Sequence, residues 1–104
     1  MIGYAPAPVP STAAASAAAA GAKVASNLTF AAVWSGDATA YPITYQSWDL
    51  VFAKQKTAND VKMLKAYIGY LLGAGQQLLT PLNLAPLPAS IDAAATAQLS
   101  KITG

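Results

Sequence analysis

The clearest pattern of hydrophobic and polar positions lies between residues 41 and 72, where the apolar repeat changes from two residues to three or four. In the first part, Trp48, Leu50 and Phe52 occupy alternate positions, which is typical of one face of a β-strand. The neighbouring positions are also largely apolar, which indicates a strand that is covered on both faces. The pattern therefore predicts a strand over residues 43–53.

The second part of this region predicts an amphipathic helix over residues 57–72. Thr57 is followed three residues later by Asp60, and this spacing is typical of a helix N-terminus. Apolar residues then recur every three or four positions, which places them on one side of a helix. This stripe consists of Val61, Leu64, Ile68, Leu71 and Leu72.

The remaining C-terminal residues predict two further helices. Gly73-Ala74-Gly75 separates the amphipathic helix from a shorter one over residues 76–79, which Pro81 ends. A loop over residues 83–88 leads to the final helix over residues 90–102. Its apolar side consists of Ile91, Ala95, Leu99 and Ile102.

Residues 1–40 are an Ala/Pro-rich lead-in that is expected to contain a helix and a crossover. Alternating prolines favour coil at the N-terminus, and Ser11 or Thr12 is then placed to cap a helix over residues 13–22. The alternative is an Ala-rich linker, because alanine adds little packing. Residues 26–34 fit either a short strand or a helical turn.

The composition indicates one domain whose core depends on its few large side chains. The chain has 104 residues, 55% of them hydrophobic, but much of that fraction is alanine, which buries little area. The core is therefore expected from the larger residues, namely Phe30, Trp34, Trp48, Phe52, the five tyrosines and the Leu, Ile and Val residues of the C-terminal half.

The residue types present argue against catalysis. The chain contains no Cys, His, Glu or Arg, which excludes Ser-His-Asp and Cys-His arrangements and thiolate metal sites. The four aspartates are scattered, so no cluster of oxygen ligands is expected around a metal ion. We therefore expect a non-enzymatic protein without cofactor or metal.

Charge and hydropathy exclude two further classes of partner. Six lysines against four aspartates give a net charge of +2, too thinly spread for a nucleic-acid interface. No run of about 18 strongly apolar residues predicts a transmembrane helix. The alanine tract after Thr12 lacks the basic residues of a signal peptide, so we expect none in this chain.

Short motifs follow one another in a set order along most of the chain. They are Ile2-Gly3-Tyr4, Ala40-Tyr41-Pro42-Ile43-Thr44, Leu50-Val51-Phe52, Lys54-Gln55-Lys56, Leu64-Lys65-Ala66-Tyr67-Ile68, Gly75-Gln76 and Asn83-Leu84-Ala85-Pro86-Leu87-Pro88. Together they resemble the C-terminal part of the phosphate-binding proteins that serve bacterial ABC importers. The resemblance is strongest from Tyr41 onward.

This resemblance implies an α/β fold, with residues 41–104 forming the C-terminal portion of one lobe of a two-lobed, type II periplasmic binding protein. The chain would then be a fragment or truncated member, a scaffold for anion capture rather than the binding site. Inorganic phosphate would bind only to the complete two-lobed protein. The implied partners are the membrane subunits of an ABC transporter, and the implied location is the periplasm or the extracellular cell envelope.

The resemblance transfers no phosphate-contacting residue to this chain, which has no arginine. Thr44, Ser47 and Asp49, which lie on the predicted strand, are the only weak candidates for a ligand contact. The alternative is a small Ala-rich helical protein with a structural or interaction role, whose amphipathic helix binds a partner. In either case, apolar faces without a covering layer are expected to promote self-association.

Overall fold

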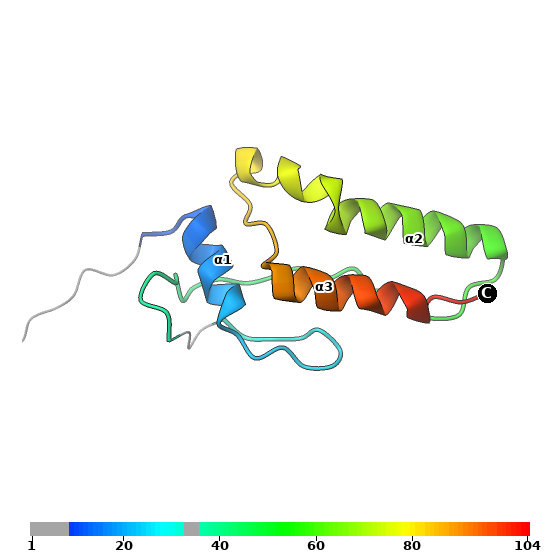
Figure 1. The fold of residues 1–104 in the computed structure, drawn as a ribbon, viewed down its shortest axis with the longest axis horizontal. Helices are drawn as coiled ribbons and strands as arrows, with labels where there is room; N and C mark the ends of the chain where they lie inside the picture. The colour runs from blue at the N-terminus through cyan, green and yellow to red at the C-terminus, as the bar shows by residue number, and fades with distance from the viewer. Residues whose placement is uncertain (1–8, 33–35) are drawn as a thin grey trace, which may run out of the picture.

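The computed structural model of the protein describes residues 9–32 and 36–104. In Figure 1, α2 and α3 lie antiparallel side by side, and α1 lies near the end of this pair where α3 begins. The α-helices are α1 (Thr12–Ala20), α2 (Ala58–Leu72) and α3 (Ala89–Gln98), and the short 3-10 helices are η1 (Ala74–Leu78), η2 (Thr80–Leu82) and η3 (Leu99–Lys101).

The predicted α/β fold is wrong, because the described part of the chain is helical and contains no sheet. Residues 43–53, predicted as a strand, form neither strand nor helix. Their nearest approach to a sheet is one parallel bridge between Lys54 and Thr103, made by 2.7 Å hydrogen bonds from Thr103 N–H to Ala53 C=O and from Gln55 N–H to Thr103 C=O. A hydrophobic pattern with a two-residue period indicates which side chains would share a face of a strand. A strand forms only when its backbone also pairs with a neighbouring strand, which this pattern does not show.

The structure confirms the amphipathic helix, which begins at Ala58 and ends at Leu72 as α2. Thr57 is the N-cap, and its hydroxyl accepts a hydrogen bond from the backbone N–H of Asp60 at 3.1 Å. The predicted apolar stripe is half-buried, since α2 packs on α3 through part of its circumference. No residue of α2 is fully buried.

The connection between α2 and α3 differs from the prediction in its details. Gly73 ends α2, but the next two residues already belong to η1, so the short helix is a 3-10 helix that starts earlier than residue 76. Gly75 is buried, and a Cβ there would lie 2.9 Å from the carbonyl oxygen of Tyr70, which only glycine tolerates. Pro81 is the second residue of η2 instead of ending a helix, because its missing N–H is not needed in a first turn.

The predicted final helix is interrupted before its end. Its α-helical part ends at Gln98, and η3 then leads to Ile102, whose backbone is extended. Ile91 and Ile102, at the two ends of the predicted apolar side, are both buried. Ala95 and Leu99 between them are only half-buried, and Ile102 lies beyond the helix, so the helical period accounts for the burial of Ile91 alone.

The structure confirms the N-terminal helix and excludes the linker alternative. Ser11 is the N-cap of α1, with its hydroxyl accepting from the N–H of Ala14 at 3.0 Å. One face of α1 packs against residues 30, 32 and 40 through a small cluster of buried alanines. The cluster consists of Ala18, Ala32 and Ala40, with Ala17 and Phe30 against it.

The expected core of large side chains is wrong for most of its named members. Trp48 is 47% exposed and Phe52 is 85% exposed, while Trp34 lies outside the described residues. Residues 26–32 form neither the strand nor the helical turn that the sequence left open. The buried hydrophobic residues among those described are Ala14, Ala18, Ala32, Ala40, Ile91 and Ile102.

Side-chain hydrogen bonds join the loop before α3 to both other helices. The amide of Gln76 donates to the carbonyl of Leu71 at 2.7 Å, and its oxygen accepts from the N–H of Leu87 at 2.8 Å. The hydroxyl of Ser16 in α1 donates to the carbonyl of Pro86 at 2.8 Å. These bonds hold the start of α3 against the end of α2 and against α1.

Replacing Gln76 by Ala is therefore expected to destabilise the protein by about 1–2 kcal/mol, since two half-buried hydrogen bonds are lost. Urea unfolding followed by circular dichroism measures the change, and hydrogen exchange at the Leu87 amide reports the local loss. Gln77→Ala is the matched control, because Gln77 is exposed in the same short helix and makes no side-chain hydrogen bond. Equal stability of both variants would contradict the proposed link.

Candidate functional site

The three most exposed large hydrophobic residues among those described lie in one stretch without regular secondary structure, residues 43–52, which we call the apolar segment. Its exposed side chains include Ile43, Tyr45, Leu50 and Phe52, of which Leu50 is 94% exposed. No backbone N–H or C=O of this segment makes a backbone hydrogen bond within the described part of the chain. Unpaired backbone beside exposed apolar side chains is typical of a surface that pairs with another chain.

The middle of the apolar segment is anchored through its side chains. The amide of Gln46 donates to the carbonyl of Phe30 at 2.6 Å, and the indole of Trp48 donates to the carbonyl of Leu28 at 3.2 Å. Residues 46 and 48 thus reach the same neighbouring loop, as a two-residue period requires. This observation agrees with the alternation seen in the sequence, although no strand forms.

A second exposed apolar surface lies on α2, which we call the outer stripe. It consists of Met63, Tyr67 and Tyr70, which are 70%, 59% and 52% exposed. Their spacings of four and three residues align them along one side of the helix. The sequence analysis did not single out these residues as a site, although the spacing was visible, because it assigned the tyrosines to packing.

Basic residues surround the start of α2. Residues 54–72 contain four lysines and one aspartate, a local excess of three positive charges, on a protein whose net charge is only +2. Lys62 is exposed beside Met63, and Lys65 is half-buried. The outer stripe is therefore an apolar surface on a helix whose neighbourhood has a net positive charge.

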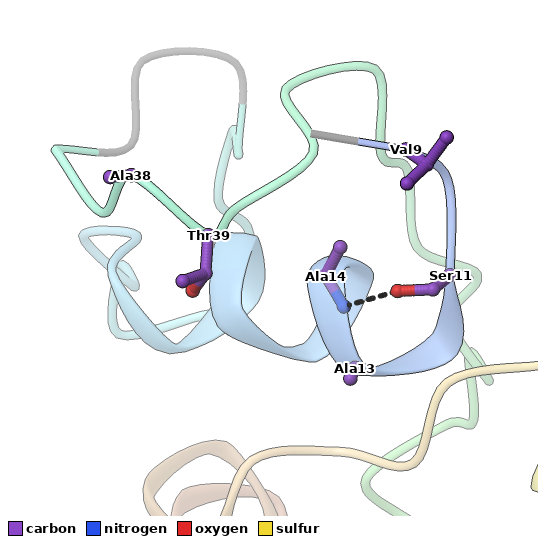
Figure 2. Close-up of a pocket in the computed structure, with 6 residues that line it drawn as sticks. All are labelled: Val9, Ser11, Ala13, Ala14, Ala38 and Thr39. Carbon is purple, nitrogen blue, oxygen red and sulfur yellow. Dashed lines mark hydrogen bonds between the residues drawn. The ribbon is translucent and has the colours of Figure 1, made fainter. Parts of the chain in front are cut away.

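Two open concavities in the described part of the chain lack the groups of a small-molecule site. One, of about 370 Å³, lies beside the start of α1; Figure 2 shows it lined by Val9, Ser11, Ala13, Ala14, Ala38 and Thr39. The dashed bond in that view shows the Ser11 hydroxyl committed to capping α1. No charged side chain lines this concavity.

The second concavity, of about 360 Å³, joins the apolar segment to α2. It is lined by Leu50, Val51, Phe52, Gln55 and Leu64. Its lining is largely aliphatic and aromatic, with one amide side chain. Such a surface fits an apolar group of another protein better than an anion, because an anion needs converging hydrogen-bond donors.

The three weak ligand candidates lie in or beside the anchored part of the apolar segment. Thr44 is half-buried, and its hydroxyl donates to the carbonyl of Tyr41 at 2.6 Å. Ser47 and Asp49 are exposed, and none of the three lines a concavity. A role for them in ligand binding stays a prediction.

Residues 9–32 and 36–104 show neither a metal-binding cluster nor a membrane-spanning helix. Within these ranges no group of three or more Asp, Glu, His or Cys side chains is placed to hold a metal ion. None of the helices described there has both the length and the hydropathy that crossing a membrane would require.

Asp37 forms a local turn that closes over the alanine cluster. Its carboxylate accepts from the Thr39 hydroxyl at 2.6 Å and from the Thr39 backbone N–H at 2.8 Å, and its carbonyl accepts from the N–H of Ala40. The hydroxyl bond first, and the backbone bond second, hold the pKa of the Asp37 carboxyl below its ordinary value. The turn orients the buried Ala40 toward α1. The N–H of the next residue, Tyr41, donates to the carbonyl of Ala14 in α1.

Comparison with known protein families, characterised proteins and solved structures finds no match to this chain.

The Thr39→Val variant is expected to raise the pKa of Asp37 toward its ordinary value, because the hydroxyl bond to the carboxylate is lost. A lowered folded pKa means that this stabilisation is present above the ordinary carboxyl pKa and disappears as the pH falls through the folded value. Carboxyl NMR titration of Asp37 measures the shift. Asp92, whose contact with Thr96 is longer at 3.3 Å, serves as the internal control in the same spectra.

Proposed function

We propose that the protein is a non-enzymatic helical interaction protein that binds a partner protein through the outer stripe of α2. The observation that carries this proposal is the exposure of Met63, Tyr67 and Tyr70 along one side of a well-capped helix. Because the opposite side of α2 packs on α3, the helix is held in place before a partner arrives. A helix that presents apolar anchors at such spacings is a common way to fill a groove in another protein.

The chemistry of the surface describes the partner. Methionine adapts to irregular apolar pockets, and tyrosine combines a large apolar ring with a polar hydroxyl. The excess of lysines around α2 favours carboxylates at the border of the groove. The expected partner is therefore a protein with an apolar groove and an acidic rim.

Tyr67→Ala is expected to weaken partner binding about 30-fold, since removal of a central aromatic anchor costs roughly 2 kcal/mol. A photo-crosslinking amino acid at Met63 identifies the partner in cells, and the purified partner then gives the affinities by titration. The same crosslinker at Ala97, which is exposed on α3, is the positional control. Equal crosslinking from both positions, or unchanged affinity of the well-folded Tyr67→Ala variant, would refute the proposal.

A second candidate function is membership of the phosphate-binding family that the ordered motifs resemble. It is favoured by the apolar segment, because exposed apolar residues beside unpaired backbone are expected of a segment whose neighbours belong to another part of a protein. In that case the chain is a scaffold for anion capture, working with ABC-transporter membrane subunits in the cell envelope. A reading frame that continues upstream of Met1 into a Ser-, Thr- and Gly-rich lobe would support this candidate.

For either function, the chain alone is expected to bind inorganic phosphate no more tightly than the millimolar range. Lysine side chains around the start of α2 attract phosphate only through screened charge, and the described residues offer no cleft of converging donors. Isothermal titration at moderate salt, with sulfate as the comparison anion, measures the affinity. A micromolar dissociation constant would disprove this expectation and make Thr44, Ser47 and Asp49 the first residues to substitute.

A further inference from the structure

The apolar segment combines three properties that are seldom left together on a protein surface. It is ten residues long, and its side chains include four large hydrophobic residues that are more than 75% exposed. Within the described residues its backbone makes no backbone hydrogen bond, and only the carbonyl of Phe52 accepts a side-chain bond, from the amide of Gln55. Its end is already held in strand-like pairing, since Ala53 and Gln55 bond to Thr103. The segment is long enough to form a strand, but the single chain provides no neighbouring strand for it to pair with.

We infer that the apolar segment pairs, antiparallel, with the same segment of a second copy of the chain. This interface lies apart from the outer stripe of α2 and does not depend on the partner proposed above. Pairing would satisfy the backbone groups along the facing edge of each segment, and would place Tyr45, Leu50 and Phe52 beside side chains of the other copy. The single chain forms no strand here because the pairing surface lies on the other copy.

Two-fold symmetry limits the possible registers. In such a dimer, a two-fold axis perpendicular to the paired strands relates the two identical segments. Residues that lie opposite each other then point to the same face, so their residue numbers differ by an even number. A pair centred on Trp48 places Tyr45 opposite Val51 and Ser47 opposite Asp49. The first is an aromatic and β-branched pair, and in the second a hydroxyl can donate to the carboxylate.

The single charge of the segment favours this register over its neighbour. Asp49 is the only ionisable acid or base between residues 43 and 52 apart from the hydroxyl of Tyr45. A pair centred on Asp49 would place two carboxylates directly opposite each other, which is destabilising. The register centred on Trp48 avoids this contact between carboxylates. The sequence of the segment therefore allows two copies to pair in this register.

The area available is sufficient for a weak dimer. Full burial of one large aromatic side chain removes about 150–250 Å² from water. Burial of about half of the four most exposed large side chains on each copy gives roughly 600–1,000 Å². That value is typical of weak, transient interfaces, and we expect a dimer that forms only at about 100 µM protein.

Sedimentation equilibrium of the full chain tests the association. The wild type is expected to be dimeric at about 100 µM, and Leu50→Lys is expected to be monomeric, because it places a charge at a position that is 94% exposed. Met63→Lys is the matched control: its side chain is 70% exposed, but it lies on α2, so the dimer should persist. A monomeric wild type at about 1 mM, or equal effects of both substitutions, would overturn the inference.

Disulfide trapping tests the register, since the natural chain has no cysteine. Mixing the Tyr45→Cys and Val51→Cys variants is expected to give a mixed disulfide, because these positions lie about 5 Å apart across the pair. Neither variant alone should link to itself, since identical positions would be about 20 Å apart along the strand. A disulfide between two copies of the same variant, or no mixed disulfide in a dimeric sample, would overturn the proposed register. A dimer in which no cysteine of this segment forms an intermolecular disulfide would overturn the proposed interface.

Discussion

The scarcity of buried apolar surface governs this structure. Four of the six buried hydrophobic residues among those described are alanines, and the two isoleucines lie near the two ends of the stretch that begins with α3. Because alanine contributes little burial, hydrogen bonds and half-buried helix contacts must hold the elements together. Larger side chains that would normally form the core are half-buried, as on α2, or exposed, as at Leu50 and Phe52.

Two sets of hydrogen bonds close the antiparallel pair of helices at its opposite ends. Gln76 joins the end of α2 to the loop before α3, and Thr103 joins the C-terminal residues to the chain just before α2. With both ends tied, α2 keeps one side against α3 and the opposite side in solvent. The same restraint that builds the fold therefore presents the outer stripe in a defined orientation.

Local signals in the sequence predicted local structure well, and non-local pairing was where the prediction failed. The caps of α1 and α2 depend on Ser11 and Thr57 and on amides three residues away, so the sequence contains all that these helix starts need. The predicted strand depended on neighbours that no short-range pattern supplies. For the candidate site, the spacing of Met63 and Tyr67 was visible in the sequence, but their exposure followed only from how α2 packs on α3.

The two exposed apolar surfaces differ in charge, and this difference separates their physical roles. The outer stripe lies in a region with three excess positive charges, so its association with a partner gains from long-range attraction and weakens as salt screens it. The apolar segment contains one carboxylate, so its pairing depends on apolar burial and on backbone hydrogen bonds, which salt screens far less. Since the segment and α2 meet at the concavity beside Leu64, pairing of two copies would bury the side of α2 near the segment and leave the outer stripe available to a different protein.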